Sequence, residues 1–383
     1  MGWSPRVIEP AELCPRQPGS IIIWHALHAD EARVFEELAR RFEATCPGAK
    51  IDIAQAPYDE IADRFAAAAR AGGGPDVLFE SSRWMAPLAE EGLLLDLTER
   101  VAPRFLQQFM PNTVATMRYR GRLYGIPESV TVLALFYNNT AVSEPPIDVQ
   151  MLALGVSATQ RLALPVGFFW GYWGMDPFGG FTFDSYSGKI LESAGLVAWL
   201  QALQHVDPMP GVELYFDFGA AEDAFAYEEA AYLVSGPWSL PRLRQTVGLD
   251  NFQVTPLPNG PVGPGSPMLQ VQGTMINGNA STLAIDVALA FGQFINLPES
   301  QERFLPTESH VTASVTVDLT DYPNLESFRE QAKAAALVVE NSNFVLLEDL
   351  GDQLYRDVLG TGADPTVAVP AFVEAVHAAT TGK

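Results

Sequence analysis

Residues 20–54 read SIIIWHALHADEARVFEELARRFEATCPGAKIDIA. The continuous apolar run at 20–24 predicts a strand that is buried on both faces. A helix is expected over 31–45, because its apolar residues fall on one face and a Pro-Gly pair follows it. These apolar residues are Val34, Phe35, Leu38 and Phe42. The alternating residues at 50–54 then predict a second strand.

The same order of strands and helices continues downstream. A second amphipathic helix is expected over 58–71, where three glycines follow, and residues 75–79 (PDVLF) predict a third strand. A β-α-β-α-β order is typical of a parallel sheet with crossover helices, which places the chain in the α/β class. No Gly-x-Gly-x-x-Gly motif follows the first strand, so a dinucleotide-binding fold has no support.

Further along the chain the pattern predicts coarser features. Residues 165–187 are rich in Gly and aromatic residues but show neither helical nor strand periodicity, which favours a surface-facing loop. The other expectations are a helical stretch over 99–118, a hairpin at 121–127, a long strand at 130–137, helices near 189–206 and 219–230, a strand at 231–234, a loop at 259–267, a β segment at 268–276, and helices to the end.

Composition bounds the class of protein. A chain of 383 residues with 48% hydrophobic content is globular and suggests two domains, or three. The net charge of -23 disfavours a nucleic-acid binder, because neutralising phosphates requires a basic patch. No apolar run approaches the roughly 18 residues that a membrane span needs.

The two cysteines, Cys14 and Cys46, allow either one disulfide or two free thiols. In a right-handed β-α-β unit the helix returns the chain to the edge where both parallel strands begin, so the two cysteines should meet there. Such a bond would tie an extended, Pro-rich arm, residues 1–19, to the first helix, and it would favour export. The first residues carry no secretory signal, so the protein is either cytoplasmic or shown here without its leader.

Several short motifs follow one another along most of the chain, from about residue 20 onward. They are Gly74-Pro75-Asp76-Val77-Leu78-Phe79, Tyr124-Gly125-Ile126-Pro127 with Leu135-Phe136-Tyr137-Asn138-Asn139, Ser235-Gly236-Pro237-Trp238, and Val254-Thr255-Pro256-Leu257-Pro258. Taken together and in this order, they make the chain resemble the extracellular solute-binding proteins of ATP-driven (ABC) importers. It is most similar to the maltose and maltodextrin group, to which the glycerol-3-phosphate binders are related.

The resemblance implies an α/β, two-lobed, periplasmic-binding-protein-like (type II) fold with a ligand cleft between the lobes. Residues 1–19 would form an N-terminal arm. The N-terminal lobe would hold 20–129 and 275–312, and the C-terminal lobe 132–270 and 316–383. The chain would cross between lobes near residues 130, 271 and 313, and the lobes would close on the ligand by rotating about these crossings.

Aromatic side chains are the first candidates for a ligand site, because flat rings cover the C–H faces of a sugar. Trp170, Tyr172 and Trp173 lie in the Gly- and aromatic-rich segment, and Trp238 follows a Gly-Pro turn where the resembled family places a stacking ring. The alternative for each ring is packing in a core.

Polar side chains near the expected strand ends and lobe crossings are the second group of candidates, because sugar hydroxyls need donors and acceptors in fixed geometry. This group, together with one further aromatic residue, contains Glu80, Ser81, Arg83, Glu128, His28, Gln270, Gln272 and Phe344. The alternatives are a Glu80–Arg83 ion pair, hydrogen bonds to hinge backbone, and loop packing. His25 and His28 could pair on a metal, but no third ligand is near in sequence, so neither a metal nor a cofactor is expected.

The expected function is therefore that of an extracellular or periplasmic carbohydrate receptor, which delivers a mono- to oligosaccharide to the membrane permease subunits of an ABC importer. It would act as a monomer, without nucleic acid, and its precursor would be a membrane-anchored lipoprotein. The alternatives are a binder of a phosphorylated or acidic solute such as glycerol 3-phosphate, which Arg83 suggests, and a sugar-sensing module. An enzyme is not expected, because neither a Gly-x-Ser-x-Gly motif nor a Walker loop is present.

Overall fold

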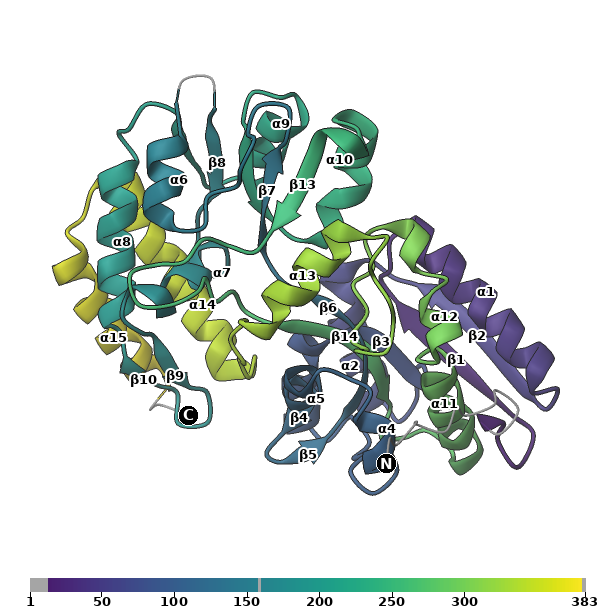
Figure 1. Cartoon of the computed structure of the whole chain (residues 1–383). Coiled ribbons are helices and arrows are strands. Elements are labelled where there is room, and N and C mark those ends of the chain that lie inside the picture. The colour runs from purple at the N-terminus through teal and green to yellow at the C-terminus, as the bar shows by residue number, and fades with distance from the viewer. Residues whose placement is uncertain (1–12, 158–159, 381–383) are drawn as a thin grey trace, which may run out of the picture. The chain divides into compact units, whose positions relative to one another are not determined.

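A computed structural model describes residues 13–157 and 160–380 (Figure 1). The chain divides into two units. The first unit holds Met1–Ser129 and Val271–Asp318, and the second holds Val130–Gln270 and Leu319–Lys383. Each unit contains one five-stranded sheet with helices packed against it, which confirms the α/β class.

The sheet of the first unit has the order β2-β1-β3-β14-β6. Its strands are β1 (Gly19–His25), β2 (Ala49–Gln55), β3 (Val77–Ser81), β6 (Gly125–Thr131) and β14 (Gln270–Ile276). β1 pairs in parallel with both β2 and β3, as the β-α-β-α-β pattern predicts, whereas β14 runs antiparallel to β3. A separate two-stranded hairpin is formed by β4 (Arg118–Tyr119) and β5 (Arg122–Leu123).

One expectation about β1 is wrong. Ile21 and Ile23 are buried, but Ile22 between them is 44% exposed, so the strand is buried mainly on one face. Side chains alternate between the two faces of a strand. The ring of Phe35 lies 5.7 Å from that of His25, which shares its face with Ile21 and Ile23, so helix α1 covers this face.

The helices of the first unit are α1 (Ala29–Thr45), α2 (Tyr58–Arg70), α3 (Met85–Glu90), α4 (Pro103–Leu106), α5 (Pro111–Thr116), α11 (Thr282–Phe294) and α12 (Pro298–Gln301). The helical stretch expected over 99–118 is not continuous, because it contains two short helices, α4 and α5. Pro103 and Pro111 each begin a helix, and a proline cannot continue a preceding one because it lacks the N–H group and clashes with the turn before it.

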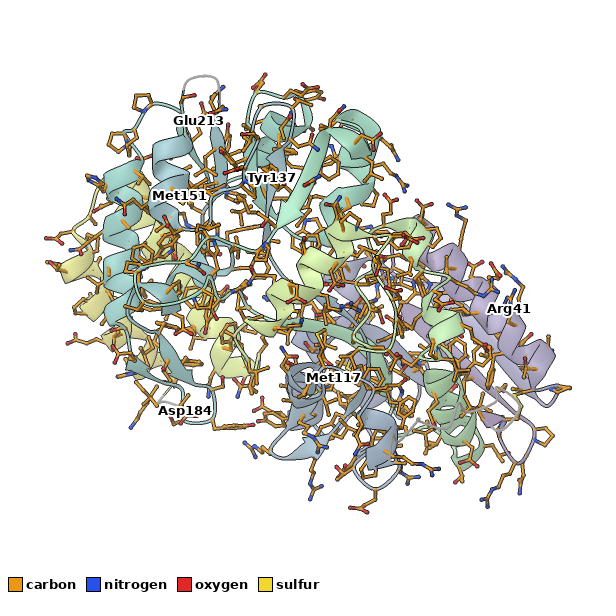
Figure 2. All side chains as sticks on the ribbon, viewed as in Figure 1. Arg41, Met117, Tyr137, Met151, Asp184 and Glu213 are labelled. Atoms are coloured by element: carbon orange, nitrogen blue, oxygen red, sulfur yellow. A yellow bond between two sulfur atoms is a disulfide. The ribbon has the colours of Figure 1, made fainter. Side chains whose placement is uncertain are left out.

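The sheet of the second unit has the order β11-β8-β12-β7-β13. Its strands are β7 (Ala134–Asn138), β8 (Leu162–Pro165), β11 (Val212–Tyr215), β12 (Tyr232–Ser235) and β13 (Phe252–Thr255). β8 is parallel to β11 and β12, whereas β7 is antiparallel to β12 and β13. The Tyr137 hydroxyl, labelled in Figure 2, joins β7 to β13 by donating to Gln253 Oε1 at 2.6 Å. The long strand expected at 130–137 is instead split between β6 and β7 in two sheets.

The helices of the second unit are α6 (Val149–Gly155), α7 (Phe168–Gly171), α8 (Ala194–Val206), α9 (Phe218–Ala226), α10 (Leu240–Thr246), α13 (Pro323–Lys333), α14 (Ser342–Tyr355) and α15 (Pro365–Thr380). α8 begins later than expected, because the preceding residues form β10 (Lys189–Glu192) and pair with β9 (Thr182–Asp184). None of the described helices combines the length and the apolar character required to cross a membrane.

A disulfide joins Cys14 to Cys46, with Cα atoms 5.3 Å apart. Cys46 caps the C-terminus of α1, and Cys14 lies shortly before β1, so the bond ties the described end of the chain to the first helix. Residues 1–12 of the arm expected over 1–19 lie outside the described residues.

Candidate functional site

Three aromatic side chains follow three neighbouring parallel strands of the second unit. Trp170 lies on α7 after β8, Trp238 lies in the 3-10 turn η5 (Pro237–Ser239) after β12, and Phe218 begins α9 after β11. Because β8, β11 and β12 are parallel, their carboxyl ends share one edge of the sheet, which is where open α/β sheets bind ligands.

These three rings contact one another, and we call Trp170, Phe218 and Trp238 the aromatic cluster. Trp170 stacks on Phe218 with 4.6 Å between ring centroids and 11° between planes. Trp238 stands edge-on to both, at 6.0 Å from Trp170 and 6.3 Å from Phe218. All three side chains are only half-buried, so the cluster keeps apolar ring surface exposed to solvent.

A buried carboxylate holds the turn that carries Trp238. Glu222 on α9 accepts a hydrogen bond from the Ser239 hydroxyl at 2.5 Å, and its second oxygen binds Arg242 Nη1 at 2.5 Å. Arg242 also binds Asp223, and Ser239 shares a hydrogen bond with Ser235 at the end of β12. The network therefore links α9, α10 and β12 around Trp238.

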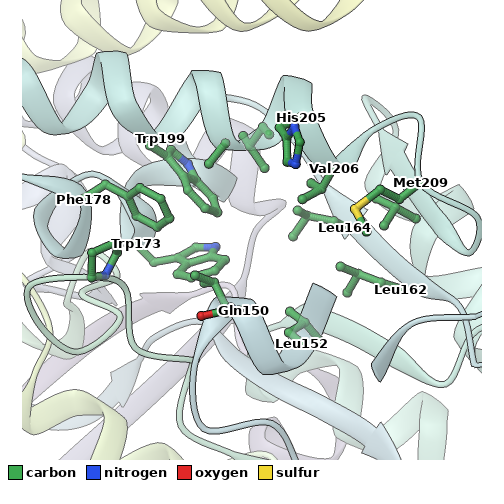
Figure 3. A pocket seen from close by; sticks show the side chains of 15 residues that line it. Gln150, Leu152, Leu162, Leu164, Trp173, Phe178, Trp199, His205, Val206 and Met209 are labelled. Carbon is green, nitrogen blue, oxygen red and sulfur yellow. The ribbon is translucent and has the colours of Figure 1, made fainter. Parts of the chain in front are cut away.

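Three aromatic candidates are buried in the structure. Trp173 is 1% exposed and packs edge-on against Trp199 with 4.8 Å between centroids (Figure 3), and Tyr172 is also buried. The surface-facing loop expected over 165–187 is thus wrong for both, because this segment folds into short helical turns that insert into the core. Phe344 is buried as well, 6.2 Å from Phe168. It lines a small cavity of about 140 Å³ together with Tyr172.

In the first unit, Glu80 lies at the carboxyl end of β3 and is 2% exposed. Its carboxylate accepts hydrogen bonds from the backbone N–H groups of Ser81, at 2.6 Å, and of Ala26. Burial raises the pKa of Glu80 to about 7, although these two donors oppose the shift. Glu80 therefore joins the loops that follow β1 and β3.

The neighbours of Glu80 differ in exposure. Ser81 is buried, and its hydroxyl accepts a hydrogen bond from the Arg83 N–H at 3.2 Å. The Arg83 guanidinium, partly exposed, lies 5.7 Å from the centroid of the Trp84 ring. His28 is exposed at the start of α1, whereas His25 is buried and its Nδ1 accepts from the Leu27 N–H at 3.1 Å. Burial lowers the pKa of His25.

Two polar candidates, Glu128 and Gln270, are buried and make hydrogen bonds or ion pairs within the fold. Glu128 on β6 is buried, 2.8 Å from His310 Nε2, and it accepts from Gln301 Nε2 at 2.7 Å. Burial lowers the pKa of His310, but the Glu128 and Glu31 carboxylates together outweigh it, so the net direction is upward. In the second unit, Gln270 Nε2 bridges both carboxylate oxygens of Glu340 at 3.2 Å.

Gln272 is partly exposed on β14 and pairs in register with Ser81 on β3. The structure therefore groups Glu80, Ser81, Arg83 and Gln272 at one end of two neighbouring strands. Among the described residues, no three His, Cys, Asp or Glu side chains lie close enough to hold a metal ion.

Sequence reasoning missed Phe218, Glu222 and Arg242. Phe218 could have been proposed from the sequence, because it follows a strand and the N-cap residue Asp217. Trp170 and Trp238 also follow strands in this way. Glu222 and Arg242 could not have been proposed, since they meet only after α9 and α10 have packed on the sheet.

Comparison with known proteins places these features in a family. The sequence profile described as bacterial extracellular solute-binding protein matches residues 26–302. The chain is 28% identical to the maltotriose-binding protein of Pyrococcus abyssi over 258 residues, which cover 63% of this chain and 54% of that protein. The chain thus spans about half the length of this curated relative.

Solved structures share the fold. The maltotriose-binding protein of Thermus thermophilus, bound to maltotriose, superposes with a TM-score of 0.78 at 20% identity, covering 94% of this chain and 99% of that one. The GacH receptor of Streptomyces glaucescens, solved without ligand and with acarbose, superposes with a TM-score of 0.80 at 20% identity, covering 94% and 98%.

Proposed function

The chain belongs to the bacterial extracellular solute-binding proteins, and from this premise we propose that it is the carbohydrate-binding receptor of an ABC importer. Its ligand is an oligosaccharide, which it delivers to the membrane permease subunits. The relatives are binding proteins and not enzymes, so we propose binding without catalysis. Export and a lipid anchor on the precursor belong to the same proposal.

The observation that carries this proposal is the aromatic cluster. A pyranose ring presents C–H groups on its faces and hydroxyl groups around its rim, so it packs against flat aromatic surfaces. Trp170 and Trp238 stand nearly perpendicular to each other, at 74°, and both keep exposed ring surface. Two perpendicular faces can contact two successive sugar units, which favours an oligosaccharide over a monosaccharide.

The first unit has polar groups of its own that are suited to recognising hydroxyl groups. Ser81, Arg83 and Gln272 lie together at the ends of β3 and β14, and we propose that they bind hydroxyls. Glu80 is buried, and we propose that it acts by holding the loops that follow β1 and β3 in place.

The names of the relatives support the choice of ligand. Those reported above bind maltotriose or acarbose, both of which are oligosaccharides or mimics of them. The phosphorylated or acidic solute suggested by Arg83 is not favoured. We propose a ligand of the maltotriose class.

A titration series tests the proposal. Calorimetry is performed with maltotriose, acarbose and glycerol 3-phosphate on the wild type, on Trp238→Ala, and on Tyr227→Ala, a control that removes a ring 68% exposed on the same unit. We expect at least one of the two oligosaccharides to bind, Trp238→Ala to lose about tenfold in affinity, or about 1.4 kcal/mol, and Tyr227→Ala to behave as wild type. Binding of glycerol 3-phosphate alone, or equal affinities of both variants, would contradict the proposal.

A further inference from the structure

The first unit encloses an ion pair just before the chain leaves it. His310 Nε2 lies 2.8 Å from Glu128 Oε1, and the two side chains are 2% and 0% exposed. The chain passes from the first unit to the second directly after Ser129, the neighbour of Glu128, and again after Asp318. The pair therefore joins two segments that lead into two of the three crossings between the units.

Backbone contacts join the same two segments. The Ala313 N–H group donates to the Glu128 carbonyl at 2.9 Å, and Ser129 forms an isolated β-bridge with Thr312. Residues 308–314 belong to no helix or strand. Their position against β6 therefore depends on a small number of contacts, among which the ion pair is the one that carries charge.

His310 faces two buried carboxylates. Glu128 is the first, and Glu31 at the start of α1 is the second, where its Oε1 accepts from the Ser309 hydroxyl at 2.8 Å. Burial lowers the pKa of His310, and the charges of both carboxylates raise it by more in sum. Among the described residues, no Lys or Arg forms an ion pair with either carboxylate, so the protonated His310 is the cation that compensates them.

The other neighbours of His310 supply no further positive charge. The ring of Phe304 stacks on His310 with 4.1 Å between centroids, and Gln301, which donates to Glu128, is neutral. Arg303 is partly exposed and binds a glutamate of α1 at 3.1 Å. Glu308, on the same segment as His310, is itself acidic.

Loss of the His310 proton leaves buried negative charge without a counterion. Breaking a buried ion pair is strongly unfavourable, because the remaining charge stays enclosed without its partner. The second carboxylate oxygen of Glu128 already has no hydrogen-bond partner among the described residues. Movement of residues 308–314 away from β6 would let water reach this carboxylate and so relieve the cost.

We propose that the His310–Glu128 pair is a pH-sensitive latch. Protonated His310 holds residues 308–314 against β6, and deprotonation in alkaline solution releases them by local opening. The sign follows from linkage: a histidine whose pKa is raised in the closed state above its ordinary 6.5 stabilises that state fully below pH 6.5, and the stabilisation is lost as the pH rises through the raised pKa. Within that window, each pH unit lowers the closing equilibrium by up to about tenfold.

Two NMR measurements on the wild type test the latch. Among the five histidines, the signal of His310 should titrate above pH 6.5. The Ala313 amide should lose protection from hydrogen exchange by up to about tenfold per pH unit above pH 6.5. Its protection should also respond to low urea much less than that of Asn277, a buried residue whose N–H group donates to the Asp76 carbonyl in the same unit, because a local opening exposes little surface.

A matched pair of variants identifies the group that titrates. Glu128→Gln/His310→Gln removes both charges, assigns the His310 signal by its loss, and should show Ala313 protection that does not vary with pH. His28→Gln removes an exposed histidine of the same unit and should keep the wild-type pH dependence. If the double variant does not fold, the wild-type exchange data decide alone. The proposal is overturned by a His310 signal that titrates at or below pH 6.5, by Ala313 protection that is constant with pH or follows urea as Asn277 does, or by a pH dependence that persists in the double variant.

Discussion

The hydroxyl group of Ser239 donates a hydrogen bond to Oε1 of Glu222, with 2.5 Å between the two oxygens. Ser239 is the residue after Trp238, and Glu222 lies on a different helix, 17 positions earlier in the chain. The other oxygen of Glu222 binds Arg242. One buried carboxylate thus fixes the turn that presents Trp238, so the orientation of this ring depends on a residue that has no ring contact of its own.

Glu222→Ala should therefore destabilise the second unit more than Asp223→Ala. Glu222 is 11% exposed and has both Ser239 and Arg242 as partners, so removing it takes an acceptor from the buried Ser239 hydroxyl and one of the two carboxylates from Arg242, at a cost of about 1–3 kcal/mol. The Asp223 side chain is 52% exposed, and its ion pair with Arg242 should contribute about 0–1 kcal/mol. Urea unfolding of both variants measures the difference, and equal losses of stability would refute the role of the network.

Phe218→Ala should weaken oligosaccharide binding without unfolding the chain. Phe218 stacks on Trp170 at 4.6 Å, so its removal leaves one face of Trp170 unsupported. Such a ring pair contributes about 0.5–1.5 kcal/mol, so we expect a loss of about two- to tenfold in the affinity for maltotriose. Phe216→Ala is the matched control, because this exposed ring lies two residues earlier, outside the cluster. Equal titration curves for the two variants would count against the cluster as a platform.

The sequence was sufficient to predict the helices and strands that local hydrophobic periodicity specifies. The β-α-β-α-β order follows from residues 20–79 because apolar spacing alone specifies buried strands and one-sided helices. Trp170 was chosen from the sequence because it lies in a segment rich in Gly and aromatic residues, and Trp238 because it follows a Gly-Pro turn where the resembled family places a stacking ring. In the structure both follow strands whose carboxyl ends share one edge of the sheet.

Contacts between segments that are distant in the chain could not be predicted from the sequence. Glu128 pairs with His310 and Gln301, which lie more than 170 residues away in the chain, and no local pattern around Glu128 indicates either contact. Trp173 was expected at the surface because its segment lacks periodicity, yet short helical turns bury it against Trp199. Hydrophobic periodicity in a sequence reveals long helices and strands. A core segment that is made of single helical turns is too short to show such a period.

Glu80 should make stability fall as the pH rises from about 4.5 to about 7. Burial raises the pKa of Glu80 from 4.5 to about 7, so the folded state holds this proton more tightly than the unfolded state does. Above about pH 7 the stability that this proton contributes to the folded state is fully lost. Glu80→Gln removes this titration while keeping an acceptor for the Ser81 N–H group. The variant should therefore gain up to about 3 kcal/mol relative to wild type between pH 4 and pH 8, measured by urea unfolding.

Glu91→Gln provides a control of opposite sign. The Arg70 side chain lowers the pKa of Glu91, so this carboxylate contributes stability at neutral pH that is lost as the pH falls through its folded pKa. As the pH rises, the free energy of unfolding of Glu91→Gln should fall relative to that of the wild type. That of Glu80→Gln should rise relative to the wild type. A stability difference between Glu80→Gln and wild type that does not vary with pH would contradict the buried, titrating carboxyl.

The Cys14–Cys46 disulfide should stabilise the chain mainly by restricting its unfolded state. It closes a loop with a sequence separation of 32, for which the chain-entropy model gives about 3–4 kcal/mol. Its two ends lie before β1 and at the end of α1, both at the edge where β1 and β2 begin, and thus away from the strand ends that carry Glu80. The Cys14→Ser/Cys46→Ser variant should therefore unfold at lower urea concentration yet bind maltotriose with unchanged affinity. A reducing agent should reproduce the loss in the wild type and leave the double variant unaffected. Two titratable thiols in unreduced, denatured wild-type protein would contradict the bond, and with it the support that a disulfide gives to export.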